Sequence, residues 1–287
     1  MYSRNFHTIA FTGGGNRCWW QAGFVSALQR MDWEMPQSVI ACSAGAGIAA
    51  ALITETTHEA LRACKELYNE NLKIVHWTHR KYLSKPRFAQ NTIYPQWLRE
   101  FLGPAEFLKL QNSTFKVSVA KLDNQRRKHW AVLTAACRYL MNRDNVKWPK
   151  TQPLPRKLAG LTADFLDLSQ CENLLQALRC LEATAAAAPF VSGREYKGET
   201  YFDGGYLCSS PSFLNASSKE PLACLTLLTR HHSDRPLTFN YFGGTYVQPS
   251  RPIPVATWGC TGAMDVDAAF RLGQDDAAKY ASGSGSD

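Results

Sequence analysis

The stretch TGGGNRCWWQAGF, residues 12–24, places three consecutive glycines and Arg17 directly before a tryptophan-rich helical pattern. Glycine has no Cβ, so a triplet of this kind brings backbone N–H groups close to a partner. Three interpretations are open from these residues alone: a phosphate-binding loop, a simple turn, or one half of an active site. The rest of the sequence has to identify the partner.

The residues on either side of this stretch alternate between extended and helical patterns. A short apolar run at 7–11 precedes the glycines, and amphipathic spacing predicts a helix over about 17–31. A strand follows at 38–41, and a helix rich in alanine and glycine follows at about 44–54. This alternation is typical of a parallel sheet covered by helices. The sequence therefore predicts an α/β fold with a mainly parallel central sheet.

The later part of the chain continues these patterns without an internal repeat. Further strands are expected at 115–122 (FKVSVAKL), 129–135 (HWAVLTA) and 221–229 (PLACLTLLT), and further helices at about 171–187 and over the closing DAAFRLGQDDAAKYA. The final SGSGSD has the composition of a flexible segment. We therefore expect one domain over 1–281 and a flexible tail over 282–287.

Composition limits the class of protein. The 287 residues are 45% hydrophobic and 20% charged, which is ordinary for a globular chain. The N-terminus lacks the apolar core of a signal peptide, and the nine cysteines contain no CxxC pair, which favours a reducing compartment. The most apolar run, 38–53, is shorter than the roughly 20 residues that span a bilayer. We expect a cytoplasmic protein with peripheral contact to the inner face of the membrane.

Residues 72–157 differ from the rest because basic residues alternate there with Trp, Tyr and Phe. This range is interpreted as a cap or insertion on the sheet. Its surface has two open interpretations: a solvated basic face with aromatics packed beneath, or an interface with an anionic lipid surface. The net charge of +8 suits anionic partners in general. Nucleic acid is not expected, because no recognised nucleic-acid module accompanies the charge.

A second motif, ACSAGAG at 41–47, lies between a predicted strand and a predicted helix. A serine with glycine two positions later, on a strand-to-helix turn, is the pattern of a nucleophile elbow. Ser43 and Gly45 fit this pattern, whereas Ala41 stands where the usual motif has its first glycine. Cys42 is a rival nucleophile, but its neighbours fit the elbow less well. We therefore expect Ser43 to be the nucleophile, with a tight packing turn as the alternative.

A nucleophilic serine needs a base and donors for the oxyanion. The segment YFDGGY at 201–206 offers Asp203 as the base, at the end of a short predicted strand. The glycine triplet offers backbone donors. On its own, DGG is a common turn, and the three motifs gain specificity only from occurring together.

Taken in order, GGGNRCWWQAGF, CSAG, ATAAAAPFV and YFDGGY resemble the patatin-like phospholipase family. The resemblance covers most of the chain and is weakest between about 60 and 165. It departs from the family pattern at two positions, where Cys18 and Ala41 replace glycine. The matching positions are Gly13, Gly14, Gly15, Arg17, Ser43, Gly45, Asp203, Gly204 and Gly205.

The resemblance implies a three-layer α/β/α fold and a serine acyl hydrolase that cleaves phospholipid or other acyl-ester lipids. It implies a dyad of Ser43 and Asp203, with an oxyanion hole at 13–15, and it assigns Arg17 to orienting the glycine loop or a phosphate. No cofactor is implied, and no metal-binding motif is present. The oligomeric state is not predicted.

Two alternatives stay open. His231 and His232 follow Asp203, so a Ser–Asp–His triad could be assembled, although both histidines follow a predicted strand among charged residues. The replacements at 18 and 41 are also consistent with a catalytically impaired protein that binds a lipid or a partner without turnover. A nucleotide-binding loop fits poorly, because GGGNRC lacks the GK(S/T) ending and the GxGxxG spacing.

Overall fold

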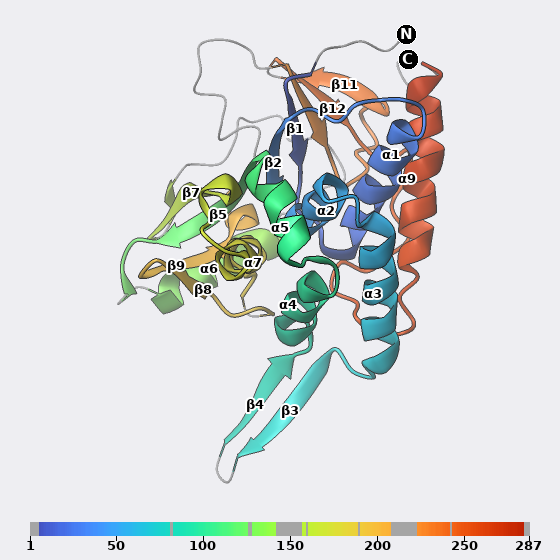
Figure 1. Cartoon of the computed structure of the whole chain (residues 1–287). Coiled ribbons are helices and arrows are strands. Elements are labelled where there is room, and N and C mark those ends of the chain that lie inside the picture. The colour runs from blue at the N-terminus through green and yellow to red at the C-terminus, as the bar shows by residue number, and fades with distance from the viewer. Residues whose placement is uncertain are drawn as a thin grey trace.

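The computed structural model describes residues 6–80, 83–125, 128–141, 157–158, 160–188, 190–207, 223–241 and 243–283. A ten-stranded sheet forms its centre, and a separate two-stranded hairpin projects from one end (Figure 1). The strands of the main sheet are β1 (Thr8–Phe11), β2 (Ser38–Cys42), β5 (Thr114–Leu122), β6 (Lys157–Leu158), β7 (Leu161–Asp167), β8 (Arg194–Tyr196), β9 (Glu199–Asp203), β10 (Cys224–Leu227), β11 (Thr238–Tyr241) and β12 (Gly244–Val247).

The middle of the sheet is parallel. Its order is β11-β12-β10-β1-β2-β5-β7-β6, and the neighbours from β12 to β5 pair in parallel. The outer pairs are antiparallel. Buried parallel strands read as continuous apolar runs, and β1 is buried along its whole length. The predicted α/β fold with a parallel centre is confirmed.

Strand β5 pairs with two strands that end near each other, β2 and β9. Its first half pairs with β2, with Ser118 opposite Cys42, and its second half pairs with β9, with Val119 opposite Asp203. Strand β9 therefore continues along β5 from the point where β2 ends. This register places the last residue of β9 beside the turn that follows β2.

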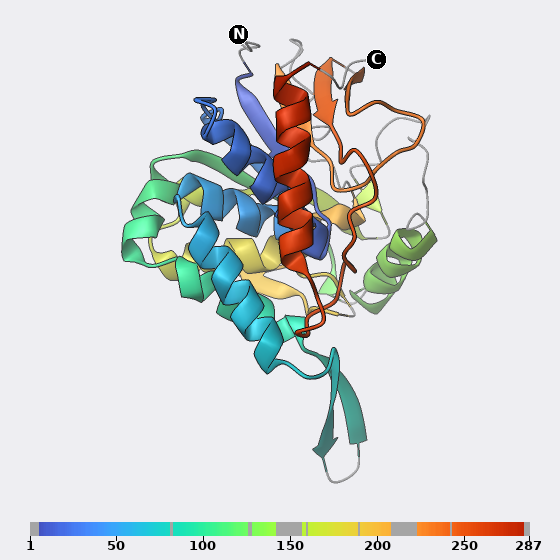
Figure 2. The same ribbon diagram turned by 90° about the vertical axis from the view of Figure 1, so that its right-hand side faces the viewer.

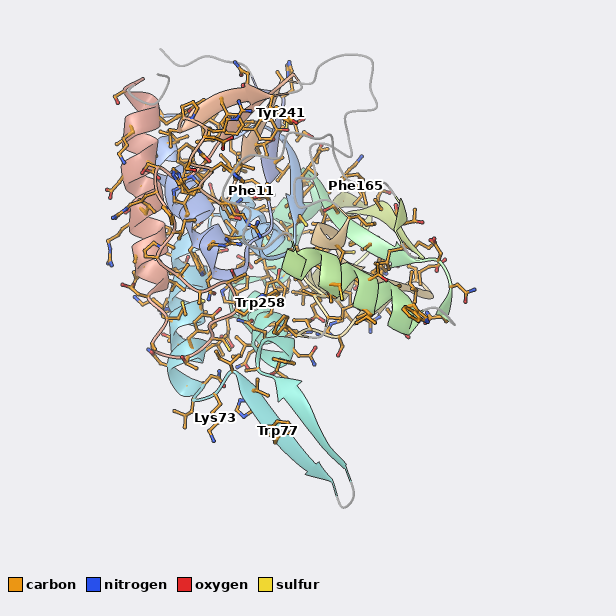
Figure 3. All side chains as sticks on the ribbon, turned by 180° about the vertical axis from the view of Figure 1, so that it is seen from behind. Phe11, Lys73, Trp77, Phe165, Tyr241 and Trp258 are labelled. Carbon is orange, nitrogen blue, oxygen red and sulfur yellow. The ribbon has the colours of Figure 1, made fainter. Side chains whose placement is uncertain are left out.

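Helices cover both faces of the sheet (Figures 1 and 3). Alternate residues of β5 show this, because Val117 and Val119 join the large core beneath α1, α2, α7 and α9, whereas Ala120 and Leu122 join a smaller core beneath α6. The helices are α1 (Trp19–Gln29), α2 (Ala44–Ile53), α3 (Thr57–Glu70), α4 (Gln90–Phe101), α5 (Pro104–Gln111), α6 (Lys128–Met141), α7 (Leu174–Thr184) and α9 (Val266–Ala281).

Helices α1 and α9 pack along each other, as Figure 2 shows with α9 in front. Gly23 and Gly273 permit this close approach, because a Cβ on either would clash with a backbone carbonyl of the opposite helix. The buried Asp276 of α9 accepts hydrogen bonds from Trp20 Nε1 (2.9 Å) and Lys279 Nζ (3.0 Å). The closing segment of the chain is therefore part of the core.

Two short strands form the hairpin, β3 (Val75–Arg80) and β4 (Leu83–Phe88). They pair only with each other among the described residues. Figures 1 and 2 show that the hairpin leaves the body from the end where α3 finishes and α4 begins.

The structure corrects one predicted strand. Residues 129–135 lie inside helix α6, which runs from Lys128 to Met141. The apolar residues of HWAVLTA fit a short strand, but the run continues to 141 without glycine or proline. A continuous segment of that length favours a helix.

Other predicted ranges need adjustment. The range 72–157, expected as a cap or insertion, contains the hairpin and α4–α6. It also contains β5, which belongs to the central sheet. Residues 142–156 of this range lie outside the described residues. The helix expected at about 171–187 begins after Asn173, whose Oδ1 caps it by accepting from Gln176 N (3.0 Å). Strand β10 ends at Leu227 rather than at 229, and residues 221–222 of that expected strand lie outside the described residues. Most of the expected tail, 284–287, is not described either.

Candidate active site

Ser43 occupies the sharp turn between β2 and α2. Its φ of 55° and ψ of −137° are a conformation that side-chain-bearing residues rarely adopt. Gly45 allows the turn to pack closely, because a Cβ there would lie 2.6 Å from the carbonyl oxygen of Thr12. Ser43 is 9% exposed. Strained backbone at a strand-to-helix turn is how a nucleophile elbow presents its hydroxyl.

Asp203 lies at the end of β9 and meets Ser43 directly. Ser43 Oγ donates a hydrogen bond of 2.6 Å to Asp203 Oδ2. The second oxygen, Oδ1, accepts from Gly205 N at 2.8 Å and from Cys42 Sγ at 3.8 Å. Gly204 begins the short 3-10 turn after the strand, packed so closely on Ser118 that a Cβ would clash with it. The structure thus brings together two motifs whose residues Ser43 and Asp203 are 160 positions apart in the sequence.

Asp203 is 5% exposed. Burial raises the pKa of Asp203 from 3.8 to about 6, although the hydrogen bonds from Ser43, Gly205 and Cys42 act in the opposite direction. Removal of a carboxylate from water disfavours its charged form, and hydrogen bonds to that form favour it. The result is a carboxylate that is ionised at neutral pH and more basic than an ordinary aspartate.

The glycine loop runs beside Ser43. A Cβ on Gly13 would lie 3.0 Å from the Cβ of Ser43. The carbonyl of Gly13 accepts from Thr229 Oγ1 (2.6 Å), and the carbonyl of Gly14 accepts from both N and Nε of Arg17 (3.3 Å each). Within the described part of the chain, the amides of Gly13, Gly14 and Gly15 donate no hydrogen bond. The three N–H groups therefore have no acceptor within the described residues.

Two threonines that sequence reasoning did not single out hold the site. Thr229 fixes the glycine loop, as described above. Thr184, the last residue of α7, accepts from Ser43 N (2.9 Å) and donates to the carbonyl of Ser118 on β5 (2.6 Å). Thr184 is fully buried. Thr184 is the one hydroxyl within ATAAAAPFV, but the sequence does not show that this hydroxyl meets Ser43.

The two departures from the family pattern fit without distortion. Ala41 lies inside β2, paired with Phe11 and Val117, and it is not among the described residues with positive φ. Its backbone therefore does not require glycine. Cys18 is buried, and its Sγ lies 3.6 Å from the carbonyl of Thr12 as a weak donor. Burial raises the pKa of the Cys18 thiol well above its usual value, so this thiol stays protonated.

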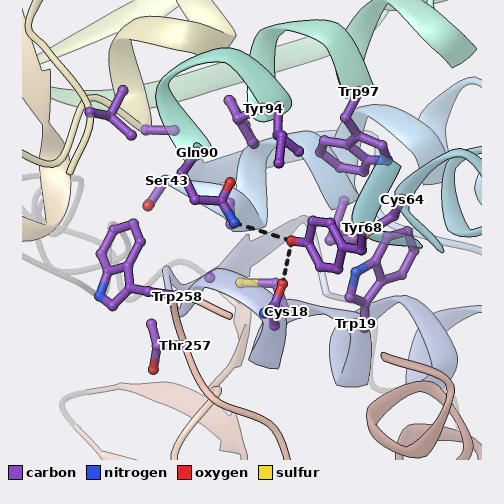
Figure 4. Close-up of a pocket in the computed structure, with 17 residues that line it drawn as sticks. Cys18, Trp19, Ser43, Cys64, Tyr68, Gln90, Tyr94, Trp97, Thr257 and Trp258 are labelled. Carbon is purple, nitrogen blue, oxygen red and sulfur yellow. Dashed lines mark hydrogen bonds between the residues drawn. The ribbon is translucent and has the colours of Figure 1, made fainter. Parts of the chain in front are cut away.

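Ser43 lines a pocket with a cavity volume of about 60 Å³ (Figure 4). Its walls are mainly apolar and aromatic, and they come from α1, α2, α3, α4 and the loop at 257–258. Trp97 is held by a hydrogen bond from Nε1 to the carbonyl of Ala60 (2.7 Å) and packs edge-on against Trp19. The apolar lining residues are Trp19, Ala44, Ile48, Ile93, Tyr94, Trp97, Ala185, Val191 and Trp258.

A hydrogen-bonded chain closes one side of this pocket. Gln90 donates to the hydroxyl of Tyr68 (3.2 Å), and that hydroxyl donates to Asn16 Oδ1 (2.7 Å), as the dashed lines in Figure 4 show. Asn16 donates in turn to the carbonyls of Ala256 (2.9 Å) and Gly259 (2.6 Å). These hydrogen bonds connect the end of the glycine loop to α3, α4 and the loop at 257–258. The pocket wall is therefore held to the loop that runs beside Ser43.

The histidines considered for a triad have other surroundings. A ring nitrogen of His231 lies 2.9 Å from the carbonyl of Pro249, and the amide of His232 donates to Gln248 Oε1 (2.7 Å). Ser43 Oγ hydrogen-bonds to a carboxylate oxygen, with no imidazole between the two groups. Nor do three or more His, Cys, Asp or Glu side chains converge as metal ligands would in the ranges described.

Chemically, the site joins a strained serine, a carboxylate of raised basicity, backbone donors without an acceptor among the described residues and an apolar pocket.

The chain resembles known proteins in sequence and in structure. Its residues 9–213 match the model of the patatin-like phospholipases. The chain is similar in structure to VipD from Legionella pneumophila, at 10% identity and a TM-score of 0.41, over 97% of this chain and 67% of that one. No curated protein sequence matches it. The family match covers more than half of the sequence, and the chain belongs to the patatin-like phospholipase family.

Proposed function

We propose that this chain is a serine acyl hydrolase that cleaves the ester bonds of membrane phospholipids through a dyad of Ser43 and Asp203. Membership of the patatin-like phospholipases supports lipid acyl hydrolase activity in general. The observation that carries the finer proposal is the 2.6 Å hydrogen bond from Ser43 Oγ to Asp203 Oδ2. A nucleophile and its base within hydrogen-bond reach are the signature of covalent catalysis.

In the first half of the reaction, Ser43 Oγ attacks the ester carbonyl while its proton passes to Asp203 Oδ2. The carbonyl oxygen becomes an oxyanion, which the amides of the glycine loop stabilise. Each such donor is worth about 3 kcal/mol in comparable sites. Asp203 then returns the proton to the departing alcohol oxygen, the ester C–O bond breaks, and the acyl group stays on Ser43.

The second half uses the same groups with water as the nucleophile. Asp203 accepts a proton from water, the resulting hydroxide attacks the acyl-enzyme carbonyl, and the proton is returned to Ser43 Oγ as the fatty acid leaves. The raised pKa of Asp203 suits this role, because a base is most effective when its pKa approaches the working pH. Arg17 supports the loop through the carbonyl of Gly14.

The pocket supports a lipid acyl chain as the group transferred to Ser43. Its aromatic and aliphatic walls resemble those of sites that bury most of an apolar ligand. The net charge of +8 supports peripheral contact with an anionic membrane surface. Among the described residues, no helix is long and apolar enough to cross a membrane.

The test compares the wild type with Ser43→Ala and Asp203→Asn on phospholipid vesicles, with products identified by mass spectrometry. We expect each variant to lose at least about 10³-fold in turnover, as removal of members of a catalytic group does elsewhere. A fluorophosphonate probe should label the wild type at Ser43 and leave Ser43→Ala unlabelled. Folded wild type that neither turns over lipid nor takes up the probe would replace the proposal with a binding-only protein.

A further inference from the structure

The hairpin β3–β4 is an isolated element. It projects from the body as a two-stranded arm (Figures 1 and 2), and in the described structure it pairs with no strand of the main sheet. A two-stranded hairpin alone is marginally stable in water. An arm of this shape therefore gains stability from a surface on which it rests.

The sequence of the arm is strongly basic. Residues 71–99, which include the hairpin and most of α4, contain no aspartate or glutamate. Lys73 precedes β3 and is exposed, and Arg87 of β4 is exposed opposite His76 in the register. The cations of residues 71–88 in the sequence are Lys73, Arg80, Lys81, Lys85 and Arg87. This charge is complementary to an anionic surface.

Apolar side chains accompany the charge at the base of the arm. Leu72 is 85% exposed, Ile74 42% and Trp77 60%. Figure 3 shows Lys73 and Trp77 on this part of the chain, pointing away from the body. Tryptophan beside lysine is typical of the headgroup level of a bilayer, where the indole leaves water and the ammonium meets phosphate. A nucleic acid can stack a base on Trp77, but it would leave the aliphatic side chains of Leu72 and Ile74 in water.

The base of the arm adjoins the rim of the pocket. Helix α3 ends and α4 begins on either side of the hairpin, and Tyr68 and Gln90 of these helices line the pocket. Phe88, at the end of β4, packs edge-on against Phe190 (4.9 Å between centroids), and Phe190 stacks on the pocket residue Trp258 (4.7 Å). A surface that held the arm would therefore lie beside the entrance to the pocket.

We propose that the hairpin β3–β4 with residues 72–74 is a docking arm for anionic bilayers that holds the rim of the pocket against the lipid surface. The proposal deepens the proposed function, on which it rests for the identity of the substrate. Docking itself does not require turnover, so the two are tested separately.

Docking is measured with the whole chain carrying Ser43→Ala, which leaves the lipid intact, by co-sedimentation with vesicles of phosphatidylcholine and anionic phosphatidylglycerol. Lys73→Glu/Arg87→Glu should lower the partition coefficient by at least about 30-fold at 0.1 M salt, because each basic residue near such a surface contributes about a factor of five. Trp77→Ala should lower it by about tenfold. At 1 M salt the effect of the charge reversals should largely vanish.

Matched controls separate the arm from total charge and from exposed tryptophan in general. Arg30→Glu/Arg179→Glu makes the same change in net charge on exposed residues of other elements, and Trp130→Ala removes a tryptophan of α6 that is 71% exposed. Both should bind as the parent does. Equal losses in the controls, losses only in the controls, or undiminished binding of the arm variants would overturn the proposal.

Turnover then distinguishes docking from catalysis. With Ser43 restored, the arm variants should lose hydrolysis of anionic vesicles by a similar factor and keep that of a soluble monomeric p-nitrophenyl ester. If the wild type were inactive on both substrates, the proposed function would be refuted. The vesicle-binding result would still decide whether the hairpin is a docking arm. The docking proposal would be refuted if the arm variants bound vesicles normally. It would also be refuted if variants shown to be folded by circular dichroism lost hydrolysis of the soluble ester as much as hydrolysis of the vesicles.

Discussion

The substitution Asp203→Asn should make the folded protein more stable at neutral pH while it removes the base. Asp203 is buried, and its pKa rises from 3.8 to about 6 on folding. This difference corresponds to about 3 kcal/mol between the two protonation states. Ionised Asp203 therefore costs the folded state about that much relative to the unfolded state. Asparagine is nearly isosteric and carries no charge to bury.

The pH dependence isolates this effect. A raised folded-state pKa means that folded protein binds more protons than unfolded protein between about pH 4 and pH 6. The stability contribution of Asp203 is fully present below about pH 4 and is lost as pH rises through about 6. We expect the advantage of Asp203→Asn to be about 2 kcal/mol larger at pH 7.5 than at pH 4, because the unfolded carboxyl is already partly ionised at pH 4.

Urea denaturation of wild type and variant at pH 4, 5, 6 and 7.5 measures the free energy of unfolding. Ser43→Ala is a control with the opposite expected sign. The hydrogen bond from Ser43 lowers the pKa of Asp203, so loss of this hydrogen bond should raise that pKa further. The Ser43→Ala variant should therefore lose stability at pH 7.5 relative to pH 4. A difference between wild type and Asp203→Asn that stays constant over this pH range would refute the argument. In the wild type, kcat/KM should rise with pH through about 6 and then level off.

Three further predictions concern the surroundings of the dyad. Thr184→Val leaves the buried Ser43 N–H and Ser118 carbonyl without a partner, so we expect a loss of about 1–3 kcal/mol in urea denaturation and a fall in kcat rather than a rise in KM; unchanged kcat would contradict its positioning role. Ala41→Gly should cost about 1 kcal/mol without increasing turnover, because residue 41 is in an ordinary strand; a tenfold gain in kcat would show that alanine impairs the elbow. His231→Ala/His232→Ala should retain ester hydrolysis in folded protein, and a collapse of kcat would favour a triad.

The parts of the fold that lie next to the motifs could be predicted from the sequence. The segments around Gly13 and Ser43 form the expected strands and helices, because short buried strands and small-residue helices have distinct local patterns. The motifs offered Asp203 as a candidate base for Ser43, and the resemblance implied the dyad, but no local pattern shows that residues 160 positions apart meet. In the structure, the register of β5 provides that link.

The supporting residues could not be predicted, because their roles arise from tertiary contacts. Thr184 ends α7 in an alanine-rich run, and nothing local shows that its hydroxyl meets the amide of Ser43. Thr229 follows β10 and holds the Gly13 carbonyl across 216 residues. The basic and aromatic composition near residue 77 was visible in the sequence, but the projecting hairpin was not, because its strands alternate poorly and include Pro86.

The arrangement of Ser43 and Asp203 is not disturbed by the two departures from the family pattern. Strain is concentrated at Ser43, whose backbone has positive φ, and at Asp203, whose charge is buried. Both residues are fixed by the neighbouring β5, directly for Asp203 and through Cys42 and Thr184 for Ser43. Cys18 is buried outside this framework, and Ala41 occupies an ordinary strand position, paired with Val117 of β5. Substitutions that disturb β5 or α7 should therefore impair catalysis more than changes at either of the unusual positions, since only the former move the nucleophile relative to its base.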